Sequence, residues 1–215
     1  MKVQVYFAKA LNLLDSFARA FALLPPARKA KCLAYRKEED RLRSMCAGLL
    51  MRRYLNVTKD EDIIIRPSGR PELASGHPIF SLSHSGALCA IAIAEDNLGL
   101  DLEHLGRKTG GGSLAHKVLT PMEYKIFTQR LDDPEFFFSI WTRKESVMKA
   151  TGQGLAMDPG NFSVIPLAKS DHFIQGKTWY FQTFEVSHHI FSICAEHGPL
   201  DINLMEATNQ ALLDP

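Results

Sequence analysis

Hydrophobic and polar positions follow two periods along this chain of 215 residues, and both periods occur in each half. Alternation with a period of two predicts β-strands, and apolar residues recurring every three or four positions predict amphipathic helices. Strands are expected at residues 3–7, 63–65, 80–82, 87–94, 98–103, 161–165, 179–186, 190–196 and 202–204. Helices are expected at residues 11–24, 26–55 (as one helix or two) and 134–151, and a further helix begins at Thr120 with a capping box to Glu123.

This order of elements predicts an α+β protein of two similar lobes, each with an antiparallel sheet and packed helices. Residues 91–102 and 192–204 echo each other, which supports a duplication with lobes at residues 1–98 and 99–215. A strand–turn–strand unit would produce the same weak echo. A chain of this length buries enough surface to fold without disulfide bonds or a structural metal.

Composition excludes several classes of protein. With 46% hydrophobic and 23% charged residues, the chain is not disordered, collagen-like or a coiled-coil rod. The net charge of +1 gives no sign of a nucleic-acid partner. Residues 1–98 carry 15 Lys and Arg against 10 Asp and Glu, and residues 99–215 carry 10 against 14. This asymmetry fits anion binding in one half and cation binding in the other, or scattered surface charge.

Cysteine usage and apolar runs bear on the compartment. No two of the four cysteines form a C-x-x-C pair, so we expect reduced, buried thiols and no zinc site. The longest uncharged apolar run, residues 86–94, is too short to span a bilayer. Charged residues interrupt the apolar N-terminal segment, unlike a signal peptide. We therefore expect a soluble, cytoplasmic protein with no membrane partner.

Two acidic residues, Asp101 and Glu103, lie on the strand expected at residues 98–103. Residues i and i+2 of a strand face the same side, so both carboxylates share one face. Like charges on one face repel unless a cation joins them, and paired carboxylate oxygens suit Mg²⁺ together with a substrate phosphate. A charged solvent face on an edge strand would give the same pattern.

The helix expected at residues 134–151 carries Glu145 and Lys149 on rows that adjoin Phe138 and Trp141. An i,i+4 Glu–Lys pair is common on solvated helices. Beside large aromatic side chains the same pair is costly to bury, and it then more often marks a functional site. The pattern alone fits either interpretation.

A third candidate is the segment with Ser83, His84 and Gly86, whose hydroxyls, imidazole and flexible backbone suit phosphate oxygens. An ordinary Ser/Gly turn has the same composition. The basic stretch at residues 28–43 suits phosphate as well, or a solvated helix face. No P-loop, dinucleotide-binding, zinc-protease or nucleophile-elbow motif is present.

Taken together, these motifs resemble the 4′-phosphopantetheinyl transferases, specifically their large surfactin-type group. That family carries a G-x-D-x-E strand and a W-x-x-K-E-S-x-x-K helix, which here span residues 99–103 and 141–149. The distance between the motifs and the total length also match. Further blocks of the family resemble residues 28–41, 69–71 and 83–86, so the resemblance covers roughly residues 24–165. It implies lobes related by a pseudo-two-fold axis, with coenzyme A in the cleft between them.

The resemblance also implies a role for each matching residue. Asp101, Glu103 and Glu145 would hold Mg²⁺ on the coenzyme A pyrophosphate, which Lys149 would bind. Glu123 matches a further acid of the family, although helix capping explains it equally well. Of the phosphate and nucleotide contacts, His84 and Ser83 would lie near the adenosine end, and Arg28, Lys31, Ser44 and Arg70 would line the nucleotide and its 3′-phosphate.

The implied reaction transfers phosphopantetheine from coenzyme A to a serine hydroxyl of an apo acyl or peptidyl carrier protein and releases 3′,5′-ADP. The serine proton would go to Glu145, or to a water held by Glu103 or Glu123. The enzyme is expected to be a monomer. Its carrier is expected to dock near residues 104–127, with Leu114, Lys117, Val118 and Lys125 interpreted as exposed.

Two other functions stay open. A non-catalytic relative that only binds carrier proteins should have lost one of the acids or the helix lysine, and this chain keeps them all. Another Mg²⁺-dependent phosphoryl-transfer enzyme or nuclease is disfavoured by the near-neutral charge and by the specific residues of the 141–149 block.

Overall fold

A computed structural model describes residues 1–107 and 112–214 of the chain. The fold divides into two compact units, Val3–Glu95 with Ile202–Pro215, and Met1–Lys2 with Asp96–Asp201. The first boundary lies three residues before the one expected at residue 98. The C-terminal segment joins the N-terminal unit, because strand β10 is hydrogen-bonded to strand β1. No helix among the described residues is long and apolar enough to cross a membrane.

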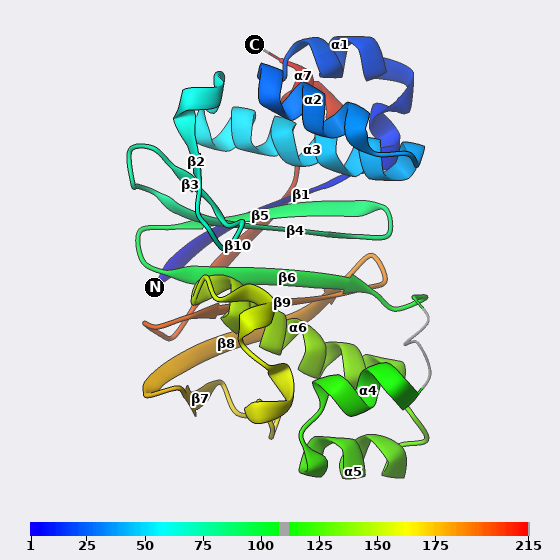
Figure 1. The fold of residues 1–215 in the computed structure, drawn as a ribbon, viewed down its shortest axis with the longest axis vertical. Helices are drawn as coiled ribbons and strands as arrows, with labels where there is room; N and C mark the ends of the chain where they lie inside the picture. The colour runs from blue at the N-terminus through cyan, green and yellow to red at the C-terminus, as the bar shows by residue number, and fades with distance from the viewer. Residues whose placement is uncertain (108–111, 215) are drawn as a thin grey trace. The chain divides into compact units, whose positions relative to one another are not determined.

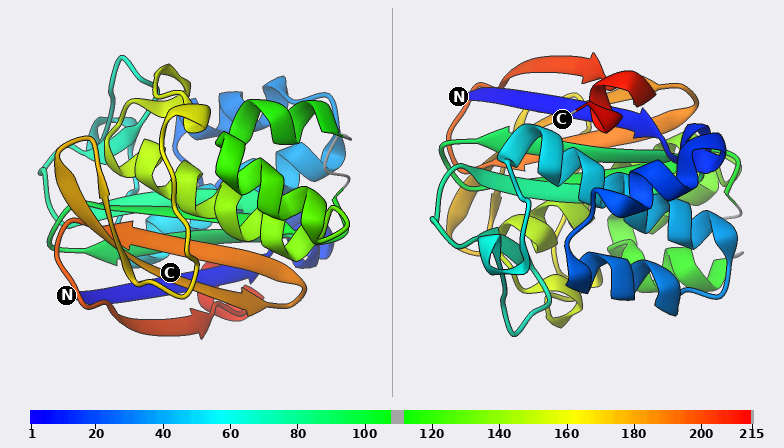
Figure 2. Two further views of the ribbon diagram at one scale, coloured as in Figure 1. Left: turned by 90° about the horizontal axis from the view of Figure 1, so that it is seen from below. Right: turned by 90° about the horizontal axis from the view of Figure 1, so that it is seen from above.

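The N-terminal unit is a four-stranded sheet in the order β10-β1-β5-β4, with helices on one side (Figures 1 and 2). The long helix α3 packs against β5, and its apolar residues form the core with those of the sheet. The strands are β1 (Lys2–Lys9), β4 (Ile79–Ser85), β5 (Leu88–Ala94) and β10 (Asp201–Glu206), with a separate hairpin of β2 (Ile63–Ile65) and β3 (Pro71–Leu73). The helices are α1 (Phe17–Ala22), α2 (Pro26–Ala34), α3 (Glu38–Leu55) and α7 (Asn209–Leu213), with 3-10 turns η1 (Ala10–Ser16) and η2 (Asp60–Asp62).

The second unit repeats this plan with a sheet in the order β6-β9-β8-β7, whose neighbouring strands are all antiparallel. Helix α6 runs along β6, β9 and β8 and buries a second apolar core against them. The strands are β6 (Leu98–His104), β7 (Asp171–Ile174), β8 (Lys177–Val186) and β9 (His189–Ala195). The helices are α4 (Gly112–Val118), α5 (Pro121–Gln129) and α6 (Pro134–Ala150), with 3-10 turns η3 (Gly154–Ala156) and η4 (Pro159–Asn161).

The predicted fold class, α+β with an antiparallel sheet and packed helices in each of two lobes, is confirmed. The two echoing segments of the sequence have a structural counterpart. Residues 91–102 contain the passage from β5 to β6, and residues 192–204 contain the passage from β9 to β10. At each of them the chain leaves one unit and enters the other. The four cysteines are free and buried, as expected.

Two local predictions were wrong. Residues 161–165 are not a strand, and the chain there is a 3-10 turn followed by irregular backbone. The first half of the helix expected at residues 11–24 is the 3-10 turn η1. Short elements β3, β7, α4 and α7 were not expected from the sequence.

Candidate active site

Strand β6 and helix α6 approach each other most closely at Gly99. A Cβ atom at this position would lie 1.8 Å from the carbonyl oxygen of Ser146 and 2.9 Å from the backbone nitrogen of Ala150. Both distances are far below van der Waals contact, so only a residue without a side chain fits. Gly99 therefore allows the strand backbone to lie directly against the helix backbone.

The next two residues on this face of β6 are Asp101 and Glu103, and both contact α6. An oxygen of Asp101 lies 2.7 Å from Nζ of Lys149, and the indole N–H of Trp141 donates to Glu103 Oε1 at 3.3 Å. Both carboxylates are buried, although β6 is an edge strand of its sheet. The shared face is confirmed, and the alternative of a solvated face is wrong because α6 covers it.

Glu145 lies on α6 between these contacts, and its surroundings disfavour its charge. The pKa of Glu145 is raised to about 7, chiefly by burial. The Asp101 carboxylate and, less strongly, Glu103 also raise this pKa, and Lys149 lowers it. A carboxyl group that titrates near neutral pH is suited to accepting a proton or to binding a cation.

This pKa predicts a pH-dependent effect of Glu145→Gln on stability. A carboxyl group titrates at a lower pH in the unfolded chain, so the folded state binds the additional proton between about pH 4.5 and 7. Wild-type stability should therefore fall as the pH rises through that window, and the variant should escape this loss. We expect the variant to be about 1 to 2 kcal/mol more stable at pH 8 and unchanged at pH 4. Thermal unfolding at both pH values measures this, and an equal effect at both would contradict it.

The carboxylates are paired with cationic side chains of the same unit. Lys149 contacts Asp101, and Arg107 Nη1 lies 2.6 Å from Glu103 Oε1. Among the described residues, no three His, Cys, Asp or Glu side chains gather closely enough to hold a metal ion as they stand. Asp101, Glu103 and Glu145 nevertheless supply hard oxygen donors on two facing backbones, and burial, helped by the neighbouring carboxylates, raises the pKa of Glu145. This donor set fits Mg²⁺ once the cationic side chains give way.

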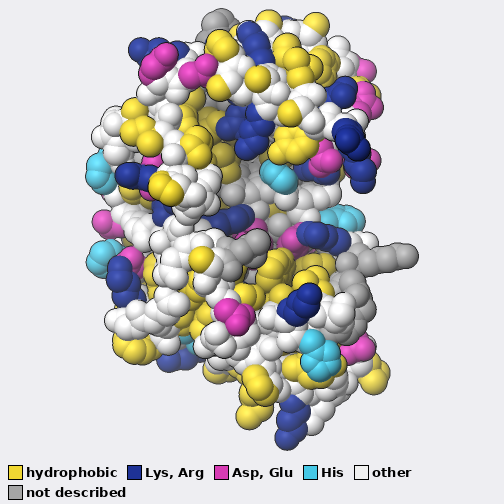
Figure 3. Space-filling model, viewed as in Figure 1, with side chains coloured by type: hydrophobic (Ala, Val, Ile, Leu, Met, Phe, Trp, Pro, Cys, Tyr) yellow, Lys and Arg dark blue, Asp and Glu magenta, His cyan; other side chains and the backbone are white. Residues whose placement is uncertain are grey.

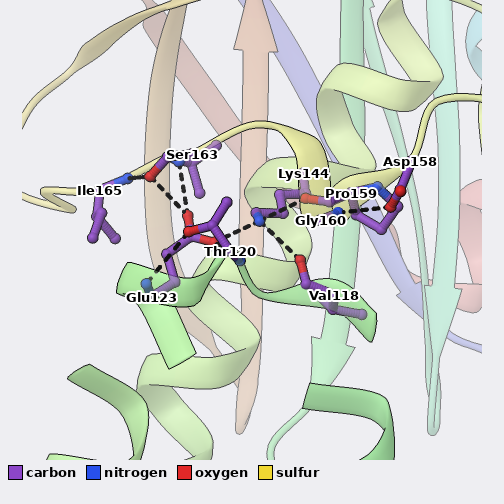
Figure 4. A network of polar contacts seen from close by, with 10 residues as sticks. Val118, Thr120, Glu123, Lys144, Asp158, Pro159, Gly160, Ser163 and Ile165 are labelled. Carbon is purple, nitrogen blue, oxygen red and sulfur yellow. Dashed lines mark hydrogen bonds and ion pairs between the residues drawn. The ribbon is translucent and has the colours of Figure 1, made fainter. Parts of the chain in front are cut away.

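A second polar cluster, centred on Glu123 and Lys144, lies at the start of α5 (Figure 4). The side chains of both residues are 0% exposed, and Lys144 Nζ donates to Glu123 Oε2 at 2.5 Å. The ammonium group also donates to the carbonyl oxygens of Val118 and Pro159, at 2.8 and 2.7 Å. Burial lowers the pKa of Lys144, while Glu123 opposes that shift.

The geometry separates the two roles that the sequence left open for Glu123. Its carboxylate accepts the backbone N–H of Thr120 at 2.9 Å, and Thr120 Oγ1 accepts the N–H of Glu123, so the predicted capping box is confirmed. The other carboxylate oxygen accepts hydrogen bonds from Ser163 Oγ and from the backbone N–H of Val164. A completely buried carboxylate with this many donors holds the scaffold together, and it is not exposed to a docked substrate.

The basic residues expected at the nucleotide lie in the N-terminal unit. Arg28 and Lys31 line a pocket of about 480 Å³ between α2, α3 and β2, whose walls are otherwise mostly apolar. Figure 3 shows one face of the molecule, on which Lys and Arg side chains lie among hydrophobic side chains. Burial is the main cause that lowers the pKa of both residues, and the charge of Arg28 lowers that of Lys31 further. This pocket combines positive charge with an apolar wall, as an aromatic anion requires.

The other predicted phosphate contacts differ in their exposure and in their position relative to this pocket. Ser44 is buried on α3, one helical turn before the pocket residue Gly48, and its Oγ has no hydrogen-bond partner. Arg70 follows the pocket residue Gly69 and lies 4.0 Å from Glu72. Ser83 and His84 lie on β4 and are not among the pocket-lining residues, Ser83 being buried and His84 exposed.

Comparison with known proteins shows which family this chain resembles. Residues 97–197, which contain β6, α6 and the Glu123 network, match the model of the 4′-phosphopantetheinyl transferase superfamily. Sfp of Bacillus subtilis, a 4′-phosphopantetheinyl transferase, is 25% identical over 204 residues, covering 87% of this chain and 89% of its own length. Over these ranges the chain is similar to 4′-phosphopantetheinyl transferases. The 4′-phosphopantetheinyl transferase HetI of a Nostoc species is 34% identical over 146 residues, which are 66% of this chain and 60% of HetI.

These relatives confirm the resemblance to the surfactin-type phosphopantetheinyl transferases and the enzyme class, a transferase. Sequence reasoning did not find the ion pair between Lys144 and Glu123 or the contact of Arg107 with Glu103. The first pair is separated by 21 residues and has no periodic signal. The second pair has i,i+4 spacing, but Glu103 lies on a strand and Arg107 follows the end of that strand. The i,i+4 rule applies to helices, so this spacing predicts no contact here.

Proposed function

We propose that this protein transfers the 4′-phosphopantetheine group of coenzyme A to a serine hydroxyl of an apo carrier protein, with Mg²⁺ as cofactor and 3′,5′-ADP as the second product. The observation that carries the proposal is the alignment of Asp101, Glu103, Glu145 and Lys149 on the facing sides of β6 and α6. Three carboxylates and one ammonium group in a partly buried site suit a metal-bound pyrophosphate.

Asp101, Glu103 and Glu145 are the residues that would hold Mg²⁺, which when bound neutralises negative charge on the pyrophosphate. Lys149, whose side chain is partly exposed, would bind a pyrophosphate oxygen as its contact with Asp101 loosens. Its positive charge would stabilise the ADP oxygen that leaves as the phosphoanhydride bond breaks. The serine oxygen forms the new phosphodiester bond, and its proton needs an acceptor.

Glu145 is the proposed proton acceptor. In the metal-free protein its pKa of about 7 lies near the pH at which proton transfer is most effective. Of the two alternatives, a water held by Glu103 would need that carboxylate to be released from Arg107 first. A water held by Glu123 would need a carboxylate accessible to solvent, and Glu123 is buried among its own hydrogen-bond donors.

The nucleotide of coenzyme A is proposed to bind at the pocket of Arg28 and Lys31. A volume of about 480 Å³ is in the range of small-ligand sites, and apolar walls with basic residues suit an adenine ring and its phosphates. Ser44 and Arg70 beside the pocket are proposed to contact the 3′-phosphate. Ser83 and His84 remain proposed contacts for phosphate near the adenosine end.

The carrier protein is proposed to dock on α4 and α5. Lys117 and Lys125 are exposed there, as expected, and they suit the acidic helix of a carrier. Val118 is buried, so its interpretation as an exposed residue was wrong, and Leu114 is only partly exposed. Met122, which the sequence did not single out, is 61% exposed and supplies the apolar contact instead.

The test is the intact mass of an apo carrier protein incubated with the enzyme, coenzyme A and Mg²⁺. We expect the carrier to gain one phosphopantetheine group, and Glu145→Gln or a chelator to slow the gain at least about a hundredfold. Glu135→Gln changes an exposed glutamate at the start of the same helix and should leave the rate unchanged.

Charge reversal at Lys117 and Lys125 should raise the KM for the carrier without changing coenzyme A binding.

Two outcomes would reject the proposed function. If coenzyme A bound but several apo carriers gained no mass, the chain would be a carrier-binding relative without catalysis. If coenzyme A did not bind, another phosphoryl-transfer chemistry would have to be considered, and titration with ATP and with an oligonucleotide would distinguish it.

A further inference from the structure

Arg107 lies just beyond β6 and returns to the carboxylate of Glu103. Its backbone N–H donates to the carbonyl oxygen of His104 at 3.0 Å. Two residues earlier, the backbone N–H of Leu105 donates to the carbonyl oxygen of His188, also at 3.0 Å. These bonds reverse the chain after the strand. The reversal places the guanidinium group 2.6 Å from Glu103 Oε1, four residues back along the chain.

The two partners of this ion pair differ in how freely they move. Glu103 is only 7% exposed, and Trp141 holds the same carboxylate oxygen from α6. The Arg107 side chain is 61% exposed and stands on irregular backbone. Glu103 is therefore fixed, whereas the guanidinium group can leave with little loss of packing.

Each carboxylate of the strand thus has a cation of its own in this structure, Lys149 for Asp101 and Arg107 for Glu103. Lys149 is more buried and extends from a helix, while Arg107 is mostly in solvent. A dication binding to Glu103 would meet strong repulsion from a guanidinium group on the same oxygen. Metal binding and the Arg107–Glu103 pair therefore compete.

We propose that Arg107 is a built-in counter-cation of Glu103, that a divalent cation displaces it, and that the released guanidinium group then binds a phosphate oxygen of the incoming substrate. This inference rests on the proposed function, because it takes the substrate to be a phosphate ester held with the metal. A planar guanidinium fork matches phosphate oxygens, and its long side chain reaches past the carboxylate that it leaves. The exchange makes metal and substrate bind better together than separately.

The test is isothermal titration of Mg²⁺ into the full-length protein, with and without saturating coenzyme A and with no carrier present. We expect Arg107→Gln to bind Mg²⁺ alone about three- to tenfold more tightly than wild type, since its competitor is gone. The factor by which coenzyme A strengthens Mg²⁺ binding should shrink in the same variant. Arg107→Lys should lie between the two proteins, because it keeps the charge but loses the fork.

Two controls make the result specific. Arg130→Gln removes another exposed arginine of the same unit, paired with Asp133, and should leave both affinities at the wild-type values. Glu103→Gln should weaken Mg²⁺ binding, with or without Arg107. The indole of Trp141 contacts Glu103, so its fluorescence gives a second reading of when the carboxylate changes partner.

Failure of this inference differs from failure of the proposed function. If wild type binds Mg²⁺ and Glu103→Gln weakens that binding, but Arg107→Gln matches wild type in affinity and coupling, the exchange is refuted and the metal site stands. If wild type binds no Mg²⁺ with or without coenzyme A, the metal site and the exchange both fail.

Discussion

Gly99→Ala should destabilise the protein by more than about 4 kcal/mol, the largest effect that we expect from any single methyl group in this chain. The added Cβ would lie 1.8 Å from the Ser146 carbonyl oxygen and 2.8 Å from its carbon. Both are backbone atoms of a buried helix, so no side-chain rotation relieves the overlap. Strand β6 and helix α6 would have to separate by more than an ångström along their whole contact.

The same separation would disrupt the candidate active site. Asp101 and Glu103 reach Lys149 and Trp141 only because the two backbones lie close together. We therefore expect any Gly99→Ala protein that folds to lose transferase activity out of proportion to its folded fraction.

Thermal unfolding of purified protein checks the first effect, with Gly160→Ala as a matched control. A Cβ at Gly160 would find its nearest atom, Asp158 Oδ1, at 3.3 Å, so that variant should unfold close to the wild-type temperature. The Gly99 variant should lose at least about 10 °C or fail to accumulate as soluble protein. An unfolding temperature within about 3 °C of wild type would show that the strand and helix are not in such close contact.

Gly99 also shows which features of the site can be predicted from the sequence and which cannot. Alternation along residues 98–103 predicted the strand and the shared face of Asp101 and Glu103, because these follow from local geometry alone. The burial of both carboxylates, and the need for glycine two residues earlier, depend on a helix more than 40 residues later in the chain. Periodicity within the strand carries no information about that partner.

Residues 161–165 show the opposite failure, a strand pattern without a strand. Buried Val164 between more exposed neighbours gives the alternation expected of a sheet. Its backbone N–H donates instead to the Glu123 carboxylate, and its carbonyl oxygen accepts from the buried guanidinium group of Arg143. Side chains from α5 and α6 satisfy the backbone where a neighbouring strand was expected, and no pattern within the segment indicates this.

The pairing of charged residues is a third feature that the sequence predicts only in part. The i,i+4 spacing of Glu145 and Lys149 suggests a pair on one helix, yet Lys149 reaches across to Asp101 on β6. The sequence therefore singled out both residues as candidates without predicting this contact. The contacts decide the chemistry, because Glu145 keeps a pKa of about 7 beside the Asp101 carboxylate.

Lys144→Met should lower the stability of the protein by about 3 to 5 kcal/mol, or roughly 8 to 15 °C in unfolding temperature. The substitution leaves the Glu123 carboxylate charged and buried without its ammonium partner. It also removes the donor to the carbonyl oxygens of Val118 and Pro159, which are distant from each other in sequence. The network that joins α4, α5 and η4 to α6 would thus lose its centre (Figure 4).

The unpaired charge of Glu123 should account for part of this loss of stability. Adding Glu123→Gln to Lys144→Met removes the unpaired buried charge, and we expect the double variant to recover about 1 to 2 kcal/mol relative to Lys144→Met alone. Lys125→Met, at an exposed position of α5, should change stability by less than about 0.5 kcal/mol. Denaturant unfolding of wild type, Lys144→Met, Glu123→Gln and the double variant gives the coupling between the two residues. Strictly additive effects would mean that the two residues contribute independently and that the ion pair itself adds no stability.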